Sequence, residues 1–312
     1  MVDALDIRIL RCMGIQPYGK EPRALETLKA SHIAKRIKTS TERVRDRIAR
    51  MEQSGIIGGY ELFPNYRHLG LAATWFYLEI RDEDLVDAAI DKIEPVEGVV
   101  GCCAFVGGLL CINVHYRSLA DLARKLRLLE SLIGKGEAQK FYDVDMPRVD
   151  RPLAGLDWRI IKALREDARR PVREVARDAR VSEKTVKRRL DRMAQEGSIF
   201  VIPLLDPSRA EGILMFSLAV RFAPDAGPSS LVAVEAALRD HMVAVDRTEV
   251  PQLGSHAFLL AARSMGEVEA LRKATAKVQG VAGARALLFR DARENWSWLD
   301  EAIDERIRAS SR

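Results

Sequence analysis

The amino-acid sequence predicts an α+β protein in which two winged helix-turn-helix domains alternate with two ferredoxin-like βαββαβ domains. Three observations support this fold class: the chain repeats itself, each copy opens with three helical patterns, and each copy continues in the order βαββαβ. A chain of 312 residues is long enough for several domains of this size, each with its own core.

The repeat consists of matching residues at two successive offsets. Residues 5–10 match residues 156–161 at an offset of 151, and farther along the chain the offset is 142. The first copy therefore carries nine extra residues within 14–29, where Pro17, Gly19 and Pro22 predict a loop. At the offset of 142, the first-copy residues with an identical partner are Ala34, Ser40, Val44, Arg47, Arg50, Met51, Gln53, Gly55, Ile57, Arg67 and Gly70.

Each copy begins with a pattern of three helices. In the second copy, apolar residues recur at helical spacing over 156–164, and Pro171 suits the first turn of a second helix. Ser182 is a typical N-cap for a third helix, and Gly197 is a typical C-cap. The apolar run 199–202 then predicts a strand, interpreted as a wing. The first copy has the same signals at Ser40, Gly55 and 56–57.

The remainder of each copy predicts a ferredoxin-like domain. In the first copy we expect strands at 74–81, 99–106, 109–116 and 138–144, with helices at 83–93 and 119–132. In the second copy we expect strands at 214–222, 243–250, 256–262 and 284–289, with helices at 231–239 and 267–278, followed by an amphipathic C-terminal helix. The predicted domains are 1–69, 70–147, 148–212 and 213–312, the last including that helix.

The two ferredoxin-like sheets should pack against each other, because a single sheet leaves one apolar face uncovered. If they pair within one chain, the chain is a pseudo-dimer, and the segment 147–155 is the linker. The alternative is pairing between chains in a homodimer with four helix-turn-helix units.

Composition indicates a cytoplasmic protein. No apolar run reaches the roughly 18 residues of a membrane helix, and the N-terminus does not have the pattern of a secretion signal. The four cysteines form no CxxC pair, which favours reduced thiols buried in strands over a disulfide or a metal site. We therefore predict no metal, no cofactor and no membrane partner.

Positive charge is concentrated in the two helix-turn-helix segments. Residues 1–60 carry a net charge of +5 and residues 151–200 carry +6, whereas 61–150 carry −5 and 201–312 carry −1. Basic segments of this kind attract a phosphate backbone, which makes double-stranded DNA the expected partner.

The third helix of each motif should lie in the major groove, with its N-terminal residues at the base edges. Arginine and lysine pair with guanine or phosphate, and threonine contacts thymine or phosphate. The alternative is a helix whose charges are merely solvated, but the cap, turn, stop and repeat together favour DNA contact. The predicted DNA-binding residues are Thr41, Arg43 and Arg45 in the first copy and Ser182, Lys184, Thr185, Lys187 and Arg188 in the second. Arg47 and Arg189 are instead predicted to pack between helices.

These motifs resemble the Lrp/AsnC family of feast/famine regulators. The resemblance rests on Leu-Asp-x-x-Ile-Leu/Ile, on the turn into Ser40 or Ser182, and on Arg-Met-x-Gln-x-Gly-x-Ile. It implies a transcription regulator with a ligand domain, and it places an effector near the central hairpins, at Gly107, Gly108, Gly254 and His256. Most members carry one unit per chain, and the usual acidic residue of their effector motif is missing here, so an amino-acid effector bound in the usual way is not expected.

The remaining residues give little sign of catalysis. The five histidines show no metal-ligand spacing, and no nucleophile-and-base constellation follows from the spacing, so we predict that the chain is not an enzyme. An alternative is a sirohaem-decarboxylase-like enzyme, because those tetrapyrrole enzymes share the same domain plan. The segment 113–117, with His115, loosely resembles such a site. A protein-interaction module is a third alternative.

Overall fold

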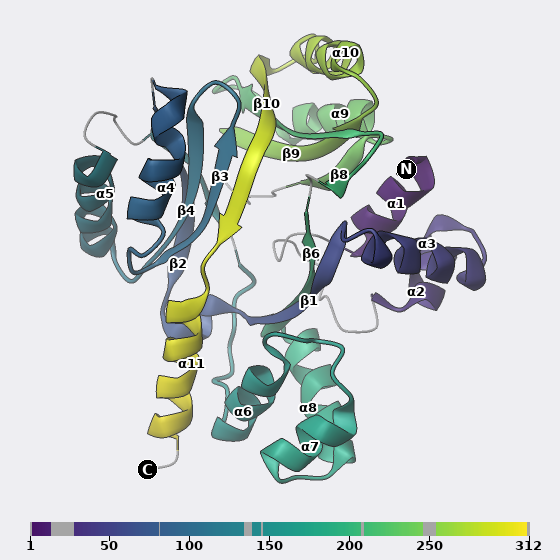
Figure 1. The fold of residues 1–312 in the computed structure, drawn as a ribbon, viewed down its shortest axis with the longest axis vertical. Helices are drawn as coiled ribbons and strands as arrows, with labels where there is room; N and C mark the ends of the chain where they lie inside the picture. Colours follow the sequence, from purple (N-terminus) through teal and green to yellow (C-terminus); the bar gives the residue numbers. More distant parts are fainter. Residues whose placement is uncertain are drawn as a thin grey trace. The chain divides into compact units, whose positions relative to one another are not determined.

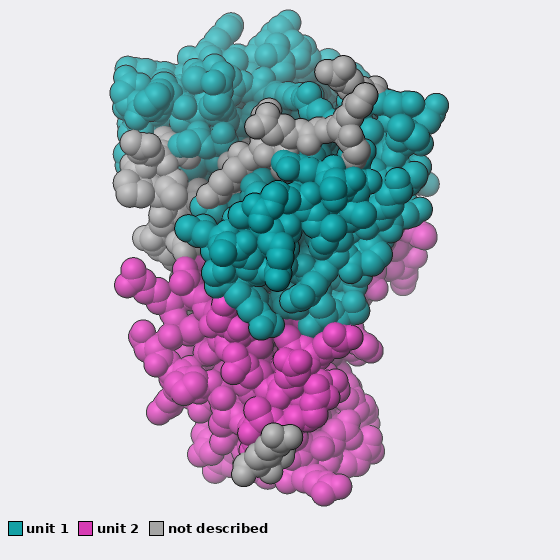
Figure 2. All heavy atoms as spheres, turned by 90° about the vertical axis from the view of Figure 1, so that its left-hand side faces the viewer, with its two compact units in different colours: residues 1–2, 71–145, 210–298 teal, residues 3–70, 146–209, 299–312 magenta. Residues whose placement is uncertain are grey.

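The computed structural model describes residues 2–13, 28–80, 82–133, 139–144, 146–206, 209–245 and 254–310. The chain divides into two compact units, coloured separately in Figure 2. We call residues 3–70, 146–209 and 299–312 the helix-turn-helix unit, and residues 1–2, 71–145 and 210–298 the sheet unit. The predicted fold class is confirmed: two helix-turn-helix motifs and two βαββαβ modules make an α+β protein. The loop predicted for the nine extra residues falls largely on 14–27, outside the described residues.

The helix-turn-helix unit contains both copies of the three-helix motif (Figure 1). The first consists of α1 (Ala4–Met13), α2 (Ala30–Ile37) and α3 (Thr41–Gln53). The second consists of α6 (Gly155–Leu164), α7 (Val172–Ala179) and α8 (Glu183–Gln195). In each copy the apolar positions at helical spacing are the buried ones: Val44, Ile48 and Met51 of α3 correspond to Val186, Leu190 and Met193 of α8.

The strands interpreted as wings pair with each other. β1 (Ile57–Pro64) and β6 (Ile199–Leu205) form an antiparallel two-stranded sheet in which Leu62 lies opposite Val201. Each strand thus finds its partner in the other copy of the repeat, not in a hairpin of its own domain. A strand edge exposes unpaired backbone groups, and here the second copy satisfies them.

Two arginines of the second copy bind to β1 and α3 of the first copy. The Arg165 guanidinium is 2.5 Å from the Glu61 carboxylate and lies 4.1 Å from the centre of the Phe63 ring. Arg169 stacks 3.6 Å from the Tyr60 ring and pairs with Glu52 at 2.6 Å. These contacts join the second copy to the first within one unit.

The C-terminal helix α11 (Ser297–Ala309) continues the chain from the sheet unit into the helix-turn-helix unit. From Leu299 onward it groups with the second helix-turn-helix, where Asp300 pairs with Arg165 at 3.2 Å and Asp304 pairs with Lys162. The sequence-based boundaries instead assign this helix to the second ferredoxin-like domain.

The sheet unit contains one continuous sheet of eight strands in the order β5-β2-β4-β3-β10-β7-β9-β8. The first module consists of β2 (Ala72–Glu79), α4 (Val86–Ile93), β3 (Val99–Phe105), β4 (Leu109–Tyr116), α5 (Leu119–Ile133) and β5 (Gln139–Val144). The second consists of β7 (Leu214–Phe222), α9 (Pro228–Leu238), β8 (Met242–Val245), β9 (Ser255–Ala262), α10 (Met265–Ala276) and β10 (Val281–Glu294).

The two modules join edge to edge through β3 and β10, which lie side by side in Figure 1. The sequence predicts face-to-face packing of two separate sheets, and the structure differs from that prediction. β10 is longer than the expected strand at 284–289 because its residues 281–288 pair with β7, whereas 289–294 continue along β3. The sheets of the two modules therefore associate within one chain.

Each face of the continuous sheet has its own apolar core. On one face, Phe76, Leu110 and Ile112 pack with α4 and α5 residues in the first module, and Phe216, Leu218 and Phe258 form the corresponding core in the second. The opposite face, which we call the inner face, carries a smaller cluster that crosses the junction and includes Trp75, Tyr77, Phe105, Cys111, Leu287 and Phe289. No helix in the described part of the chain is long and apolar enough to cross a membrane.

Asn65 provides a test of how the helix-turn-helix unit is held together. Its fully buried side chain donates to the carbonyl oxygens of Pro147 and Gly197, both at 2.9 Å, and accepts from the Arg67 N–H at 3.0 Å. Asn65→Ala leaves these groups without partners, so we expect the free energy of unfolding to fall by about 1–3 kcal/mol. Urea denaturation measures this change. The exposed variant Gln53→Ala is the control, and equal stability of the two variants would contradict the assignment.

Candidate nucleic-acid interface

The third helix of each helix-turn-helix is oriented by a serine cap. The Ser182 hydroxyl accepts a hydrogen bond from the Thr185 N–H at 3.2 Å, and the Ser40 hydroxyl accepts one from the Arg43 N–H at the same distance. These bonds satisfy an N–H group that the first helical turn otherwise leaves without a partner. The predicted caps are therefore present in both copies, at the start of α8 and of α3.

A buried aspartate fixes the inner side of α8. Asp157 on α6 has a side chain that is 1% exposed, and it receives Arg189 and Arg192 of α8, each at 2.8 Å. Its carboxylate also accepts the Ala154 N–H at the start of α6. Burial alone would raise the pKa of Asp157, but the bonds from Arg189, Ala154 and Arg192 outweigh burial and hold the pKa below its ordinary value of 3.8.

The first copy has a related contact with a different set of partners. Arg47 of α3 pairs with Asp6 at 3.0 Å and with the half-exposed Asp3 at 2.5 Å. Arg47 and Arg189 are thus oriented toward the first helix of their own motif, as predicted for packing residues. In the first copy one arginine binds two carboxylates, whereas in the second copy two arginines bind one carboxylate.

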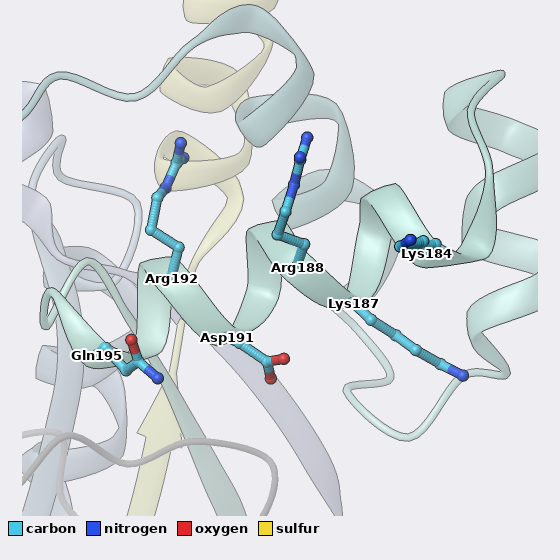
Figure 3. Close-up of a pocket in the computed structure, with 6 residues that line it drawn as sticks. All are labelled: Lys184, Lys187, Arg188, Asp191, Arg192 and Gln195. Atoms are coloured by element: carbon cyan, nitrogen blue, oxygen red, sulfur yellow. The ribbon is translucent and has the colours of Figure 1, made fainter.

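The outer side of α8 carries the predicted DNA-binding cations. Lys184, Lys187 and Arg188 are exposed, and none has an ion-pair partner among the described residues. They lie along an open hollow of about 630 Å³ whose lining residues all belong to α8: Lys184, Lys187, Arg188, Asp191, Arg192 and Gln195. In Figure 3, Arg188 and Arg192 extend from one side of the helix, and Lys187 and Asp191 from the other. Because Arg192 is paired with Asp157 and Glu196, the positive charge of this surface comes from Lys184, Lys187 and Arg188, against the single carboxylate of Asp191.

The outer side of α3 is more mixed. Arg43 and Arg45 are exposed and Thr41 is partly exposed, but the carboxylates of Glu42 and Asp46 are exposed on the same helix. The net charge of these four ionisable side chains is zero. The first copy therefore presents a weaker positive surface than the second.

The turn before each third helix contains one cation that the sequence-based prediction of DNA-binding residues omits. Lys38 and Arg180 are exposed and occupy the left-handed backbone region, with φ of 55° and 56°. Residues other than glycine rarely adopt this conformation, and the two positions correspond at the offset of 142. That match in the repeat is the signal that could have identified them.

The expected effector residues belong to different modules of the sheet unit. Gly107 and Gly108 have positive φ and form the turn between β3 and β4. Gly254 precedes β9, and His256 is buried against the Phe222 ring at 5.5 Å, in the helix-covered core. Whether these residues bind an effector remains a prediction. No three His, Cys, Asp or Glu side chains within the described ranges are placed to hold a metal ion.

The helix-turn-helix of the second copy matches a known family model. Residues 155–194 match the AsnC-type helix-turn-helix domain, which confirms the resemblance for α6 to α8. No curated protein matches the chain in sequence.

Solved structures resemble the chain in fold. Two structures of the sirohaem decarboxylase NirDL match almost the whole length. One, in complex with an iron-uroporphyrin III analogue, has 15% identity and a TM-score of 0.55 and covers 98% of this chain and 99% of that chain. The other has 14% identity, a TM-score of 0.56 and 99% coverage of both. E. coli AsnC has 22% identity over 49% of this chain and 98% of its own, with a TM-score of 0.32.

The full-length resemblance corrects one prediction. We predicted from the sequence that the chain is not an enzyme, and the proteins that share its fold from end to end are enzymes. The prediction relied on finding no catalytic spacing along the sequence, and such spacing is a poor guide where residues far apart meet on one sheet.

The contact between Asp157 and its two arginines makes a testable contribution to stability. Asp157→Asn leaves Arg189 without a charged partner among the described residues and leaves Arg192 only Glu196, at 3.7 Å. We therefore expect a loss of about 2–3 kcal/mol at pH 7. Because the folded-state pKa of Asp157 is lowered, this contribution is complete above the unfolded-state pKa and disappears as the pH falls through the folded-state value. The difference between wild type and variant should therefore be constant from pH 5 to 8 and shrink below about pH 4.

Chemical denaturation at several pH values measures this difference. The matched variant Asp6→Asn should lose less, because Arg47 retains Asp3. Equal losses in the two variants, or a difference that does not depend on pH, would rule out the proposed role of Asp157.

Proposed function

We propose that the chain is a sequence-specific DNA-binding transcription regulator that contacts DNA mainly through α8. The observation that carries the proposal is the division of cations on this helix. Arg189 and Arg192 are bound to Asp157, whereas Lys184, Lys187 and Arg188 are exposed and have no carboxylate partner among the described residues. A helix that is held on one side and carries exposed, unpaired cations is suited to the phosphates and base edges of a major groove.

The AsnC-type match of residues 155–194 supports this proposal. So does the cap at Ser182, whose exposed hydroxyl lies at the helix N-terminus, where the backbone N–H groups favour a phosphate. Arg180, at the preceding turn, adds an exposed cation beside the same helix end. We assign Thr185, Lys184, Lys187 and Arg188 to base edges and phosphates.

The two motifs should read different sequences. At corresponding positions α3 has Thr41, Glu42, Arg43, Arg45 and Asp46, where α8 has Glu183, Lys184, Thr185, Lys187 and Arg188. Identical helices in a homodimer require a palindromic site, because the symmetry of the site mirrors that of the protein. We infer that one chain acts as a pseudo-dimer, in which both motifs belong to one compact unit, so its two half-sites need not be related.

Removing two cations from each helix tests the assignment. We expect Lys184→Ala with Arg188→Ala to weaken DNA binding more than Arg43→Ala with Arg45→Ala, although both variants lose the same charge. If both second-copy residues contact phosphate, the slope of log affinity against log salt concentration should become shallower by about one to two. A contact with guanine would instead lower affinity by about 1–3 kcal/mol at one base position.

Affinity titrations at several salt concentrations, on a selected binding site and on scrambled DNA, provide the measurement. All four positions are exposed, so circular dichroism should show unchanged helix content in both variants. Wild-type affinity and slope in the Lys184/Arg188 variant would show that α8 does not read DNA.

A second candidate function is catalysis on a tetrapyrrole, favoured by the full-length fold shared with sirohaem decarboxylase. In this chain His115 lies on the inner face of the sheet unit, with 2% of its surface exposed. Burial, followed by the nearby Lys125, lowers the pKa of His115 to about 3, so the imidazole is neutral at physiological pH. A neutral imidazole is the form that ligates a metal macrocycle.

Titration with iron uroporphyrin III tests this candidate by absorbance. Binding at one site predicts a saturable change in the visible spectrum that His115→Ala abolishes. His256→Ala is the matched control, because that histidine is equally buried in the helix-covered core. A linear spectral change, or the same saturable change in the His115 variant, would eliminate His115 as the ligand.

A further inference from the structure

Asn113 lies in the interior of the sheet unit and is not used by either function proposed above. It is on β4, where its backbone register places it opposite Trp75 of β2 and Gly101 of β3. Its neighbours at 110, 112 and 114 face the helix-covered core, so Asn113 belongs to the inner face of the sheet. Only 2% of its surface is exposed.

The Asn113 amide has no hydrogen-bond partner among the residues that the structure describes. Both its Oδ1 and its Nδ2 are buried without a partner, and so is the indole Nε1 of Trp298. Buried polar atoms in folded proteins are nearly always bonded to protein, water or ligand. Three such atoms in one region are available to a molecule that can bond to them.

Asn113 and Trp298 both lie close to His115. His115 follows Asn113 by two positions on the same face of β4, and its ring contacts the Trp298 ring edge-on at 5.6 Å. The Trp296 ring contacts the same imidazole at 6.2 Å. The unsatisfied amide thus lies near a wall of aromatic rings at one end of β4.

The neighbour of Asn113 on β3 is a glycine. Gly101 carries no side chain at the position opposite Asn113, and a Cβ there would lie 3.9 Å from the Asn113 Cβ and 3.8 Å from the Trp75 ring. The register between β3 and β4 shifts at Val99 and Gly101, a bulge of the kind that often lies beside binding sites. The sheet is also curled, because Cα atoms of β5 approach those of β9 within 8 Å.

From this arrangement we propose that the inner face of the sheet unit binds a small, uncharged, planar molecule with an amide-like edge. The Asn113 Nδ2 donates to the carbonyl of that edge, and the Asn113 Oδ1 accepts its N–H. The Trp298 Nε1 donates to a second acceptor, and the aromatic wall stacks against the ring. A charged group would pay a large desolvation cost among neutral partners.

The burial of the residues around the site favours a small ligand. Asn113 and His115 are each 2% exposed, and Trp296 and Trp298 lie against the imidazole. Such enclosed surroundings favour a single ring over a molecule as large as a tetrapyrrole. The site does not depend on DNA binding, so either proposal can fail alone.

Calorimetric titration of the full chain with nicotinamide and with uracil tests the proposal. We expect saturable binding of at least one of these probes, and affinity weakened roughly tenfold or more in Asn113→Leu. In the absence of ligand, Asn113→Leu should raise the melting temperature, because it removes an unsatisfied buried amide and keeps a similar volume. Asn113→Asp should lose binding and lower the melting temperature, because it buries a charge.

Three outcomes would overturn the proposal. Absence of binding by both probes at millimolar concentration would indicate ordered water only. Equal binding in wild type and Asn113→Leu would place the site elsewhere. Binding of iron uroporphyrin III alone, lost in Asn113→Leu, would assign these atoms to a tetrapyrrole substrate instead.

Discussion

Backbone N–H and C=O groups along the edge of a strand need a partner, and each copy of this repeat leaves edges that the other copy fills. In the helix-turn-helix unit, β1 of the first copy pairs with β6 of the second. In the sheet unit, β3 of the first copy pairs with the C-terminal part of β10. Fusion of the copies in one chain makes both pairings intramolecular, so they do not depend on protein concentration. The ion pairs of Arg165 and Arg169 with the first copy form only where the β1–β6 pairing has brought the two copies together.

The second constraint is electrostatic and decides which cations of α8 remain unpaired. A fully buried carboxylate at Asp157 is stable only when it is paired, and it draws Arg189 and Arg192 to the inner side of α8. The remaining cations that we assign to DNA, Lys184, Lys187 and Arg188, are exposed and have no carboxylate partner among the described residues. In the first copy, Glu42 and Asp46 offset Arg43 and Arg45. Both copies thus have an arginine that pairs with an aspartate of the first helix of the motif. The positive outer surface is found mainly in the second copy.

Local signals in the sequence were sufficient to predict the helices and strands of this fold. They were not sufficient to predict which distant strands pair. Helical spacing, the caps at Ser40 and Ser182 and the inward roles of Arg47 and Arg189 could be inferred because each depends on neighbouring residues. The exchange of strands between copies could not, because a strand such as 199–202 has the same pattern whether it forms a hairpin or pairs across the repeat. Asn113 was missed for a related reason: its significance comes from a sheet that leaves its amide without a partner, which no motif in the sequence records.

The central claim is that one chain reads DNA with two different helices held in one unit. Selection of bound duplexes from a random-sequence pool by the wild-type chain, followed by sequencing, tests it most directly. If both helices contact one site, the enriched duplexes should share two dissimilar half-sites at a single fixed separation, with the more constrained half read by α8. Enrichment of a palindrome would show that two chains pair like with like, and the absence of any enriched motif would contradict sequence-specific DNA binding itself.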